Sequence, residues 1–129
     1  MTQSERSVWI AGRVLLSMIF ILSALGKLAD LGGTAGLMRG AGVPAVWLFL
    51  PAAIVLELGG GIAILSGYGI RLGVIALIVF LIPVTLIFHP FWQASGVERL
   101  GQMINFMKNL AIMGALLIVI PASVAAERS

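Results

Sequence analysis

Cysteine is absent from this chain of 129 residues, and its absence removes several kinds of chemistry. Without a thiol, the chain offers no disulfide exchange, no thiol catalysis and no cysteine ligands for an iron–sulfur cluster. Histidine occurs once and the few carboxylates are scattered, which argues against a structural zinc or di-iron centre. The sequence therefore predicts no metal site and no covalently bound cofactor.

Charge is also scarce. Only 10% of the residues are charged and 60% are hydrophobic, whereas soluble domains carry about 25% charged residues. A soluble core of this size could not hide so much apolar surface. The net charge of +3 comes from residues spread along the chain, so it forms no nucleic-acid patch. We therefore expect an integral membrane protein whose first partner is the lipid bilayer.

The apolar residues fall into four runs, each close to the length that crosses a bilayer. A span of about 20 residues matches a hydrocarbon core of about 30 Å. Such runs must be helical, because lipid offers no partners to unsatisfied backbone groups. The sequence thus predicts an all-α fold, a single membrane domain built as a four-helix bundle, with spans at about 8–28, 45–66, 70–88 and 102–120.

The connections between these runs differ in length. Gly67-Tyr68-Gly69 reads as a tight turn, and residues 34–39 of the first long loop suit a short interfacial helix. An even number of spans places both termini on one side of the membrane. Lys and Arg are divided almost equally between the two sides, and we expect the termini to lie in the cytoplasm.

Three ionisable residues, Arg13, Glu57 and Lys108, fall well inside the predicted spans, whereas Lys27 and Arg71 lie at span ends. From the loop side, a rise of about 1.5 Å per residue places Glu57 roughly 16–18 Å deep and Arg13 roughly 20 Å deep. Lys108 lies roughly 9 Å deep by the same count. We therefore expect an ion pair between Arg13 and Glu57, with Lys108 as an unpaired positive charge. A buried positive charge favours an anion or an electron-rich carbonyl such as that of a quinone.

The fourth predicted span begins with a polar stripe of Gln102, Asn105, Lys108 and Asn109, which share one helix face. Intramembrane ionisable residues are functional candidates by default, and His89 near this stripe could exchange protons close to neutral pH.

Structural roles are the alternative for each of these residues. Glu57 would fix the helix register, and Arg13 and Lys27 would extend to the headgroup layers. His89 would cap a helix end, and Asn105 and Asn109 would hold helices together by hydrogen bonds.

Several short segments, taken in order, resemble the DoxX family of small bacterial membrane proteins. They are Arg13, Ser23-Ala24-Leu25-Gly26-Lys27-Leu28, Gly42-Val43-Pro44, Glu57-Leu58-Gly59-Gly60-Gly61, Gly69-Ile70-Arg71-Leu72, His89-Pro90-Phe91 and Asn105-Phe106-Met107-Lys108-Asn109-Leu110. The resemblance implies a four-helix protein of the bacterial inner membrane. The family takes its name from a subunit of a thiosulfate:quinone oxidoreductase, and other members look like membrane partners of redox or detoxification enzymes.

The expected function is a membrane subunit of a quinone-linked redox system. Its predicted ligand, a quinone or small anion, would lie between the helices, contacted by Arg13, Glu57, His89, Asn105, Lys108 and Asn109. A soluble redox subunit and further copies of the chain are candidate partners. The alternatives are a non-catalytic membrane anchor or assembly partner, and a membrane protein that binds a small solute or lipid. The residues leave open whether the chain is an enzyme.

Overall fold

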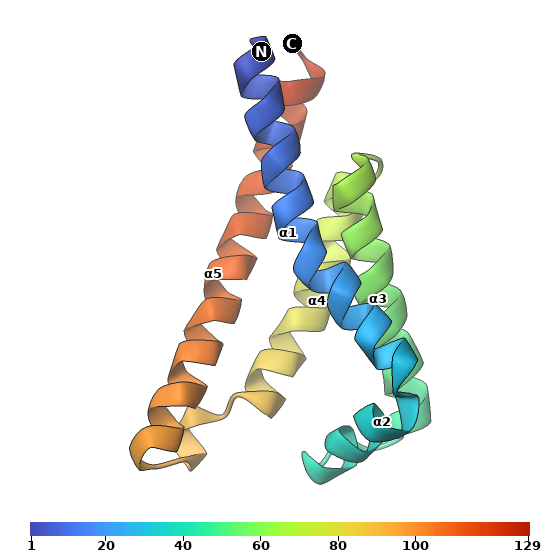
Figure 1. Cartoon of the computed structure of the whole chain (residues 1–129), viewed down its shortest axis with the longest axis vertical. Coiled ribbons are helices and arrows are strands. Elements are labelled where there is room, and N and C mark those ends of the chain that lie inside the picture. The colour runs from blue at the N-terminus through green and yellow to red at the C-terminus, as the bar shows by residue number, and fades with distance from the viewer.

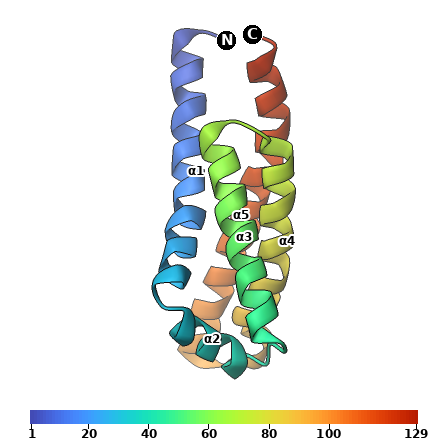
Figure 2. The same ribbon diagram turned by 90° about the vertical axis from the view of Figure 1, so that its right-hand side faces the viewer.

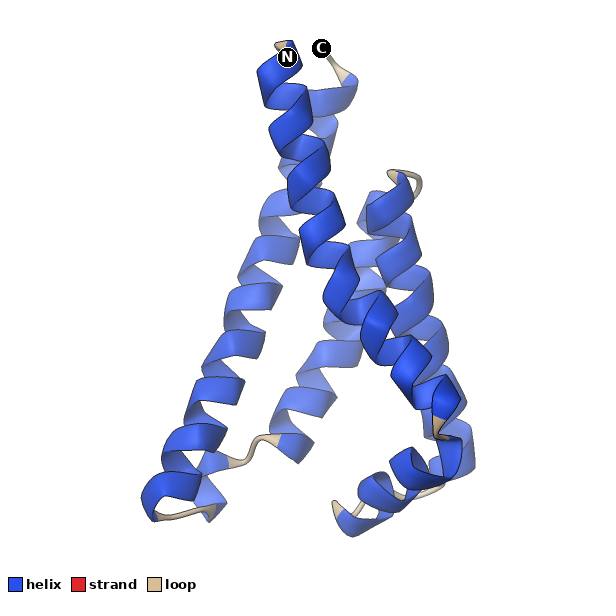
Figure 3. Ribbon diagram, in the orientation of Figure 1, coloured by secondary structure: helices blue, strands red, loops and turns tan.

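The computed structural model describes all residues from Met1 to Ser129. The chain is helical throughout, with short turns and no strand (Figure 3). This confirms the predicted all-α class. The elements in order are α1 (Gln3–Ala29), α2 (Leu31–Gly40), α3 (Val46–Ser66), α4 (Ile70–Phe88), the 3-10 turn η1 (Phe91–Gln93) and α5 (Gly96–Glu127).

Four of these helices, α1, α3, α4 and α5, are long and apolar enough to cross a membrane. Both termini lie at one end of the bundle, and α2 lies at the opposite end (Figures 1 and 2). We call these the terminal end and the loop end. Many large apolar side chains, such as Leu15, Val55 and Leu72, are exposed on the outside of the bundle. A bundle that is apolar outside as well as inside suits a lipid environment.

The outer helices are longer than predicted. The helix α1 begins at Gln3, ahead of the predicted span start at residue 8. The Thr2 side chain accepts a hydrogen bond from the Glu5 backbone N–H, and the Glu5 carboxylate accepts one from the Thr2 backbone N–H. Likewise α5 starts at Gly96 and continues through Pro121 to Glu127, well outside the predicted range of 102–120. As a result, α1 and α5 extend beyond the α3–α4 turn at the terminal end (Figure 1).

The predicted interfacial segment forms α2, a helix at the loop end (Figure 2). The Asp30 side chain caps it by accepting a hydrogen bond from the Gly33 N–H. Its buried Ala35 and Met38 pack against Val46, Leu50 and Ile54 of α3 in a small apolar cluster. The short helix therefore covers the loop end of α3.

The centre of the bundle is the tight α3–α4 hairpin. Its turn needs glycine, since Gly67 and Gly69 adopt positive φ values of 86° and 66°. Along the hairpin Gly60 and Gly73 face each other, and a Cβ at Gly73 would lie 3.2 Å from the Gly60 carbonyl oxygen. Small residues permit such close contact between membrane helices. The main apolar core, which includes Phe20, Leu77 and Leu116, joins this hairpin to α1 and α5.

This packing predicts opposite effects for neighbouring glycines. A Cβ at Gly60 would lie 2.5 Å from the Leu77 Cγ, whereas one at Gly59 meets nothing within 4 Å. Gly60→Ala should therefore destabilise the protein by about 1–3 kcal/mol through overpacking. Gly59→Ala should be neutral or stabilise by up to about 1 kcal/mol, as alanine favours helix. Melting curves in detergent test this; equal shifts for both variants would contradict the hairpin packing.

Candidate functional site

A buried ion pair joins α1 to α3. The Lys27 Nζ donates a hydrogen bond of 2.7 Å to the Glu57 Oε1 and a second, of 2.9 Å, to the Ser23 Oγ. The same Nζ lies 5.3 Å from the centre of the Phe80 ring of α4. The side chain of Glu57 is 3% exposed and that of Lys27 is 22% exposed. Three helices thus meet at one charged contact.

The local sequence explains how this contact forms. Ser23 and Lys27 are four residues apart and therefore neighbours on one face of α1. Glu57 belongs to the buried face of α3, with Gly60, Gly61 and Ile64. Gly61 faces α1 closely, since a Cβ there would lie 2.9 Å from the Ile21 Cγ1. A carboxylate in so apolar a position requires a partner, and Lys27 supplies it.

The prediction that Arg13 pairs with Glu57 is wrong. The Arg13 Nη2 instead donates to the Leu65 carbonyl oxygen at 3.0 Å, near the terminal end of α3. Eight residues separate Leu65 from Glu57, which is about 12 Å along a helix. The error arose because α1 packs against α3 in a register that puts Lys27 at Glu57 and Ile21 at Gly61, so that Arg13 lies level with the α3–α4 turn at Gly67.

The other candidate residues lie between α4 and α5. The His89 Nδ1 is 2.9 Å from the Gln102 Oε1, and the Asn109 Nδ2 donates to the Thr85 Oγ1 at 3.0 Å. Asn109 is buried. Phe106 of α5 packs edge-on against Phe91 and Trp92 of the connecting turn; these three rings form an aromatic cluster. These contacts fix α4 against α5 at the loop end.

Lys108 does not face the interior. Its side chain is exposed on α5, and Asn105 is half-buried. The only ion pair in the structure joins Lys27 to Glu57, so Lys108 neither approaches Glu57 nor supplies a buried positive charge. The expected constellation of Arg13, Glu57 and Lys108 is therefore dispersed. Sequence reasoning missed Lys27 as the partner of Glu57, although its spacing from Ser23 was a usable signal.

An apolar groove of about 490 Å³ is lined mainly by α3 and α4, and neither Lys27 nor Glu57 is among its lining residues. It runs along α3 and α4 toward the loop end. Phe80 links the two features, because its ring lies near the Lys27 ammonium and also lines the groove. The remaining lining is Met38, Val43, Pro44, Phe49, Ala52, Ala53, Leu56, Val79, Pro83, Val84, Ile87 and Phe88.

Comparison with known proteins agrees with this architecture. The DoxX family model matches residues 8–90, which run from α1 to the end of α4. The chain belongs to the DoxX family. It is 36% identical over 110 residues to the inner membrane protein YqjF of Escherichia coli (strain K12), and 30% identical over 110 residues to the inner membrane protein YphA of the same organism. Each alignment covers 85% of this chain and 79% of the relative.

These relatives and the four apolar helices make this DoxX protein a multi-pass protein of the bacterial inner membrane. No solved structure matches the chain. The segment that matches the DoxX model contains the Lys27–Glu57 pair and the whole groove, whereas α5 with Lys108 lies outside it. The pair and its groove are therefore features of the part of the chain that defines its family membership.

The ion pair predicts strong coupling between its partners. Lys27→Met leaves the buried Glu57 without a counter-charge and should cost about 3 kcal/mol of stability. Glu57→Gln should cost somewhat less, since Lys27 is partly exposed. The double variant should lose less than the sum of the two, as judged by thermal unfolding in detergent.

The matched control combines Glu57→Gln with Arg13→Gln. Arg13 bonds to a different part of α3, so these two losses should add. If the losses of Glu57→Gln and Arg13→Gln do not add, while those of Glu57→Gln and Lys27→Met do, the Lys27–Glu57 pairing is refuted.

Proposed function

We propose that this DoxX-family protein is a membrane subunit of a quinone-linked redox system and that it binds the quinone head beside the Lys27–Glu57 pair. The observation that carries the proposal is that the Lys27 ammonium has one N–H donor without a partner in the protein. It has three N–H donors, of which Ser23 and Glu57 take two. With 22% of the side chain exposed, a third donor remains for a ligand carbonyl.

Charge balance favours a quinone over an anion at this position. The Glu57 carboxylate offsets the charge of Lys27 at 2.7 Å, so the pair is neutral as a whole. A neutral carbonyl gains a charge-assisted hydrogen bond from Lys27 without requiring further counter-charge. An anion would meet the Glu57 carboxylate as well as the ammonium. This supports the quinone among the ligands expected from the sequence.

The groove supports the same ligand class. Quinones of bacterial membranes carry a long apolar tail, and the groove lining is apolar from Met38 to Phe88. The Phe80 ring lines the groove and lies 5.3 Å from the Lys27 Nζ, which supports a ligand that reaches both. A head group held by Lys27 could therefore extend its tail along α3 and α4. Reduction of the quinone takes two electrons and two protons, and a soluble redox subunit would supply the electrons, because this chain has no cysteine.

One observation favours the alternative of an assembly partner. Lys108 is exposed on a helix that is apolar enough to span the membrane, and a charge in such a position calls for a counter-charge or for access to the headgroups. A second subunit docked on α5 would provide the counter-charge. In that case Lys108→Met would release a partner and leave ligand binding unchanged.

The test titrates a quinone with a short isoprenoid tail into the purified protein in detergent. The variants are Ala52→Phe, which narrows the groove without touching the ion pair, and the double variant Lys27→Met with Glu57→Gln, which removes both charges and leaves no unpaired one. Each should weaken binding about tenfold or more, the loss expected for one charge-assisted hydrogen bond or for the tail contacts.

Lys108→Met is the matched control, since it removes a lysine from the same membrane half and should leave the affinity unchanged. Melting curves confirm that each variant is folded. Wild-type affinity in both the groove variant and the double variant would disprove the site.

A further inference from the structure

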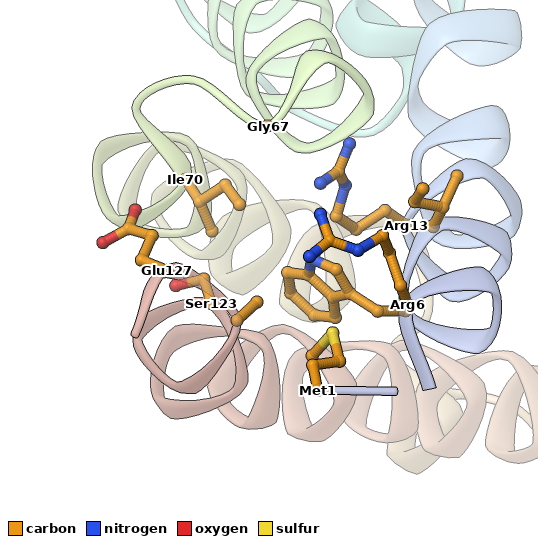
Figure 4. Close-up of a pocket in the computed structure, with 10 residues that line it drawn as sticks. Met1, Arg6, Arg13, Gly67, Ile70, Ser123 and Glu127 are labelled. Carbon is orange, nitrogen blue, oxygen red and sulfur yellow. The ribbon is translucent and has the colours of Figure 1, made fainter. Parts of the chain in front are cut away.

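A second pocket lies at the terminal end, away from the ion pair and its groove. Its volume is about 210 Å³, and α1, the α3–α4 turn and the end of α5 enclose it. Two of its lining residues are arginines, Arg6 and Arg13, and Trp9 lies between them in the sequence (Figure 4). The spacing of three and four residues places all three on one face of α1.

The Arg13 guanidinium is held firmly on two sides. Its Nη2 donates to the Leu65 carbonyl oxygen, and its Cζ lies 5.5 Å from the Trp9 ring centre. The α3–α4 turn packs directly on it, since a Cβ at Gly67 would lie 2.9 Å from the Arg13 Nη1. The Nε is nevertheless buried without a hydrogen-bond partner. A buried donor without an acceptor is costly, and a ligand oxygen would satisfy it.

No carboxylate neutralises this pair of arginines. The only ion pair in the structure is the one between Lys27 and Glu57. Glu127 lines the pocket, but in Figure 4 its carboxylate points away from the two guanidinium groups. The pocket thus presents an oriented, unneutralised positive charge. The excess positive charge that the sequence led us to expect at Lys108 is found here instead.

The position of the pocket fits the headgroup layer. Arg13 lies level with the α3–α4 turn, which marks the end of the two central spans. An arginine fork matches the oxygens of a phosphate group, and the apolar Ile10 and Ile70 also line the pocket.

We propose that the Arg6–Trp9–Arg13 pocket is a phosphate-binding site. Arg13 contributes its buried Nε–H and its fork, Arg6 adds a second guanidinium to the pocket lining, and the Trp9 ring packs against the Arg13 guanidinium. The phosphate belongs either to the headgroup of an anionic phospholipid or to a soluble phosphate compound that reaches this end of the protein.

The experiment uses the full chain purified in detergent. Native mass spectrometry measures retention of phosphatidylglycerol, and titration in lipid-free detergent measures binding of inorganic phosphate. The test variants are Arg13→Gln and Arg6→Gln. Arg71→Gln is the matched control, because Arg71 is exposed at the same end of the bundle and does not line the pocket. Arg13→Lys keeps the charge and removes the fork.

A phospholipid site is supported if the wild type retains phosphatidylglycerol and Arg13→Gln and Arg6→Gln weaken retention about tenfold, while Arg71→Gln does not. Inorganic phosphate binding with the same pattern supports a soluble ligand. Arg13→Lys should fold like the wild type and still lose affinity. If the wild type holds neither probe, or if Arg71→Gln lowers binding as much as Arg13→Gln, the proposal is overturned.

Discussion

The contact between Lys27 and Glu57 sets the relation of α1 to the rest of the bundle. A carboxylate that is 3% exposed cannot remain charged in an apolar bundle without its partner. To pair the Glu57 carboxylate with Lys27, α1 and α3 must meet at one level. Ser23 then accepts a further hydrogen bond from the Lys27 ammonium, and Phe80 of α4 lies beside it. A single charged contact therefore fixes the relative height of two helices and brings in a third.

Glycine allows the central hairpin to form beside that contact. Gly60 and Gly73 bring α3 and α4 close together, and the two helices diverge toward the loop end (Figure 1). The apolar groove occupies that stretch, with α2 residue Met38 at its edge. Close packing near the turn and the groove near the loop end are thus two consequences of one hairpin, and the ion pair lies where they meet.

The two ends of the bundle differ chemically. Toward the loop end the buried charges cancel, and the remaining polar contacts, such as that between Asn109 and Thr85, are neutral hydrogen bonds that hold helices together. At the terminal end Arg13 is fixed by a backbone carbonyl and an indole and has no carboxylate partner. A neutral carbonyl ligand suits the first environment and a phosphate suits the second, so the two proposed ligands would lie at different levels of the bundle.

Hydropathy alone determined that the chain is an all-α membrane protein. The Gly67–Gly69 turn and the short helix near residues 34–39 could also be predicted, because a turn and a short helix depend on the local residue types and on the backbone. The tertiary structure decided which charges meet. The register of α1 against α3 brings Arg13 level with the α3–α4 turn and Lys27 level with Glu57. Similarly, the rotation of α5 about its own axis in the bundle buries Asn109 and leaves Lys108 exposed. Helix content follows from the sequence of each segment. The relative height of two helices, and the side of each that points into the bundle, depend on how separate helices pack. A shift of a few residues along one helix changes the contacts of every residue on it.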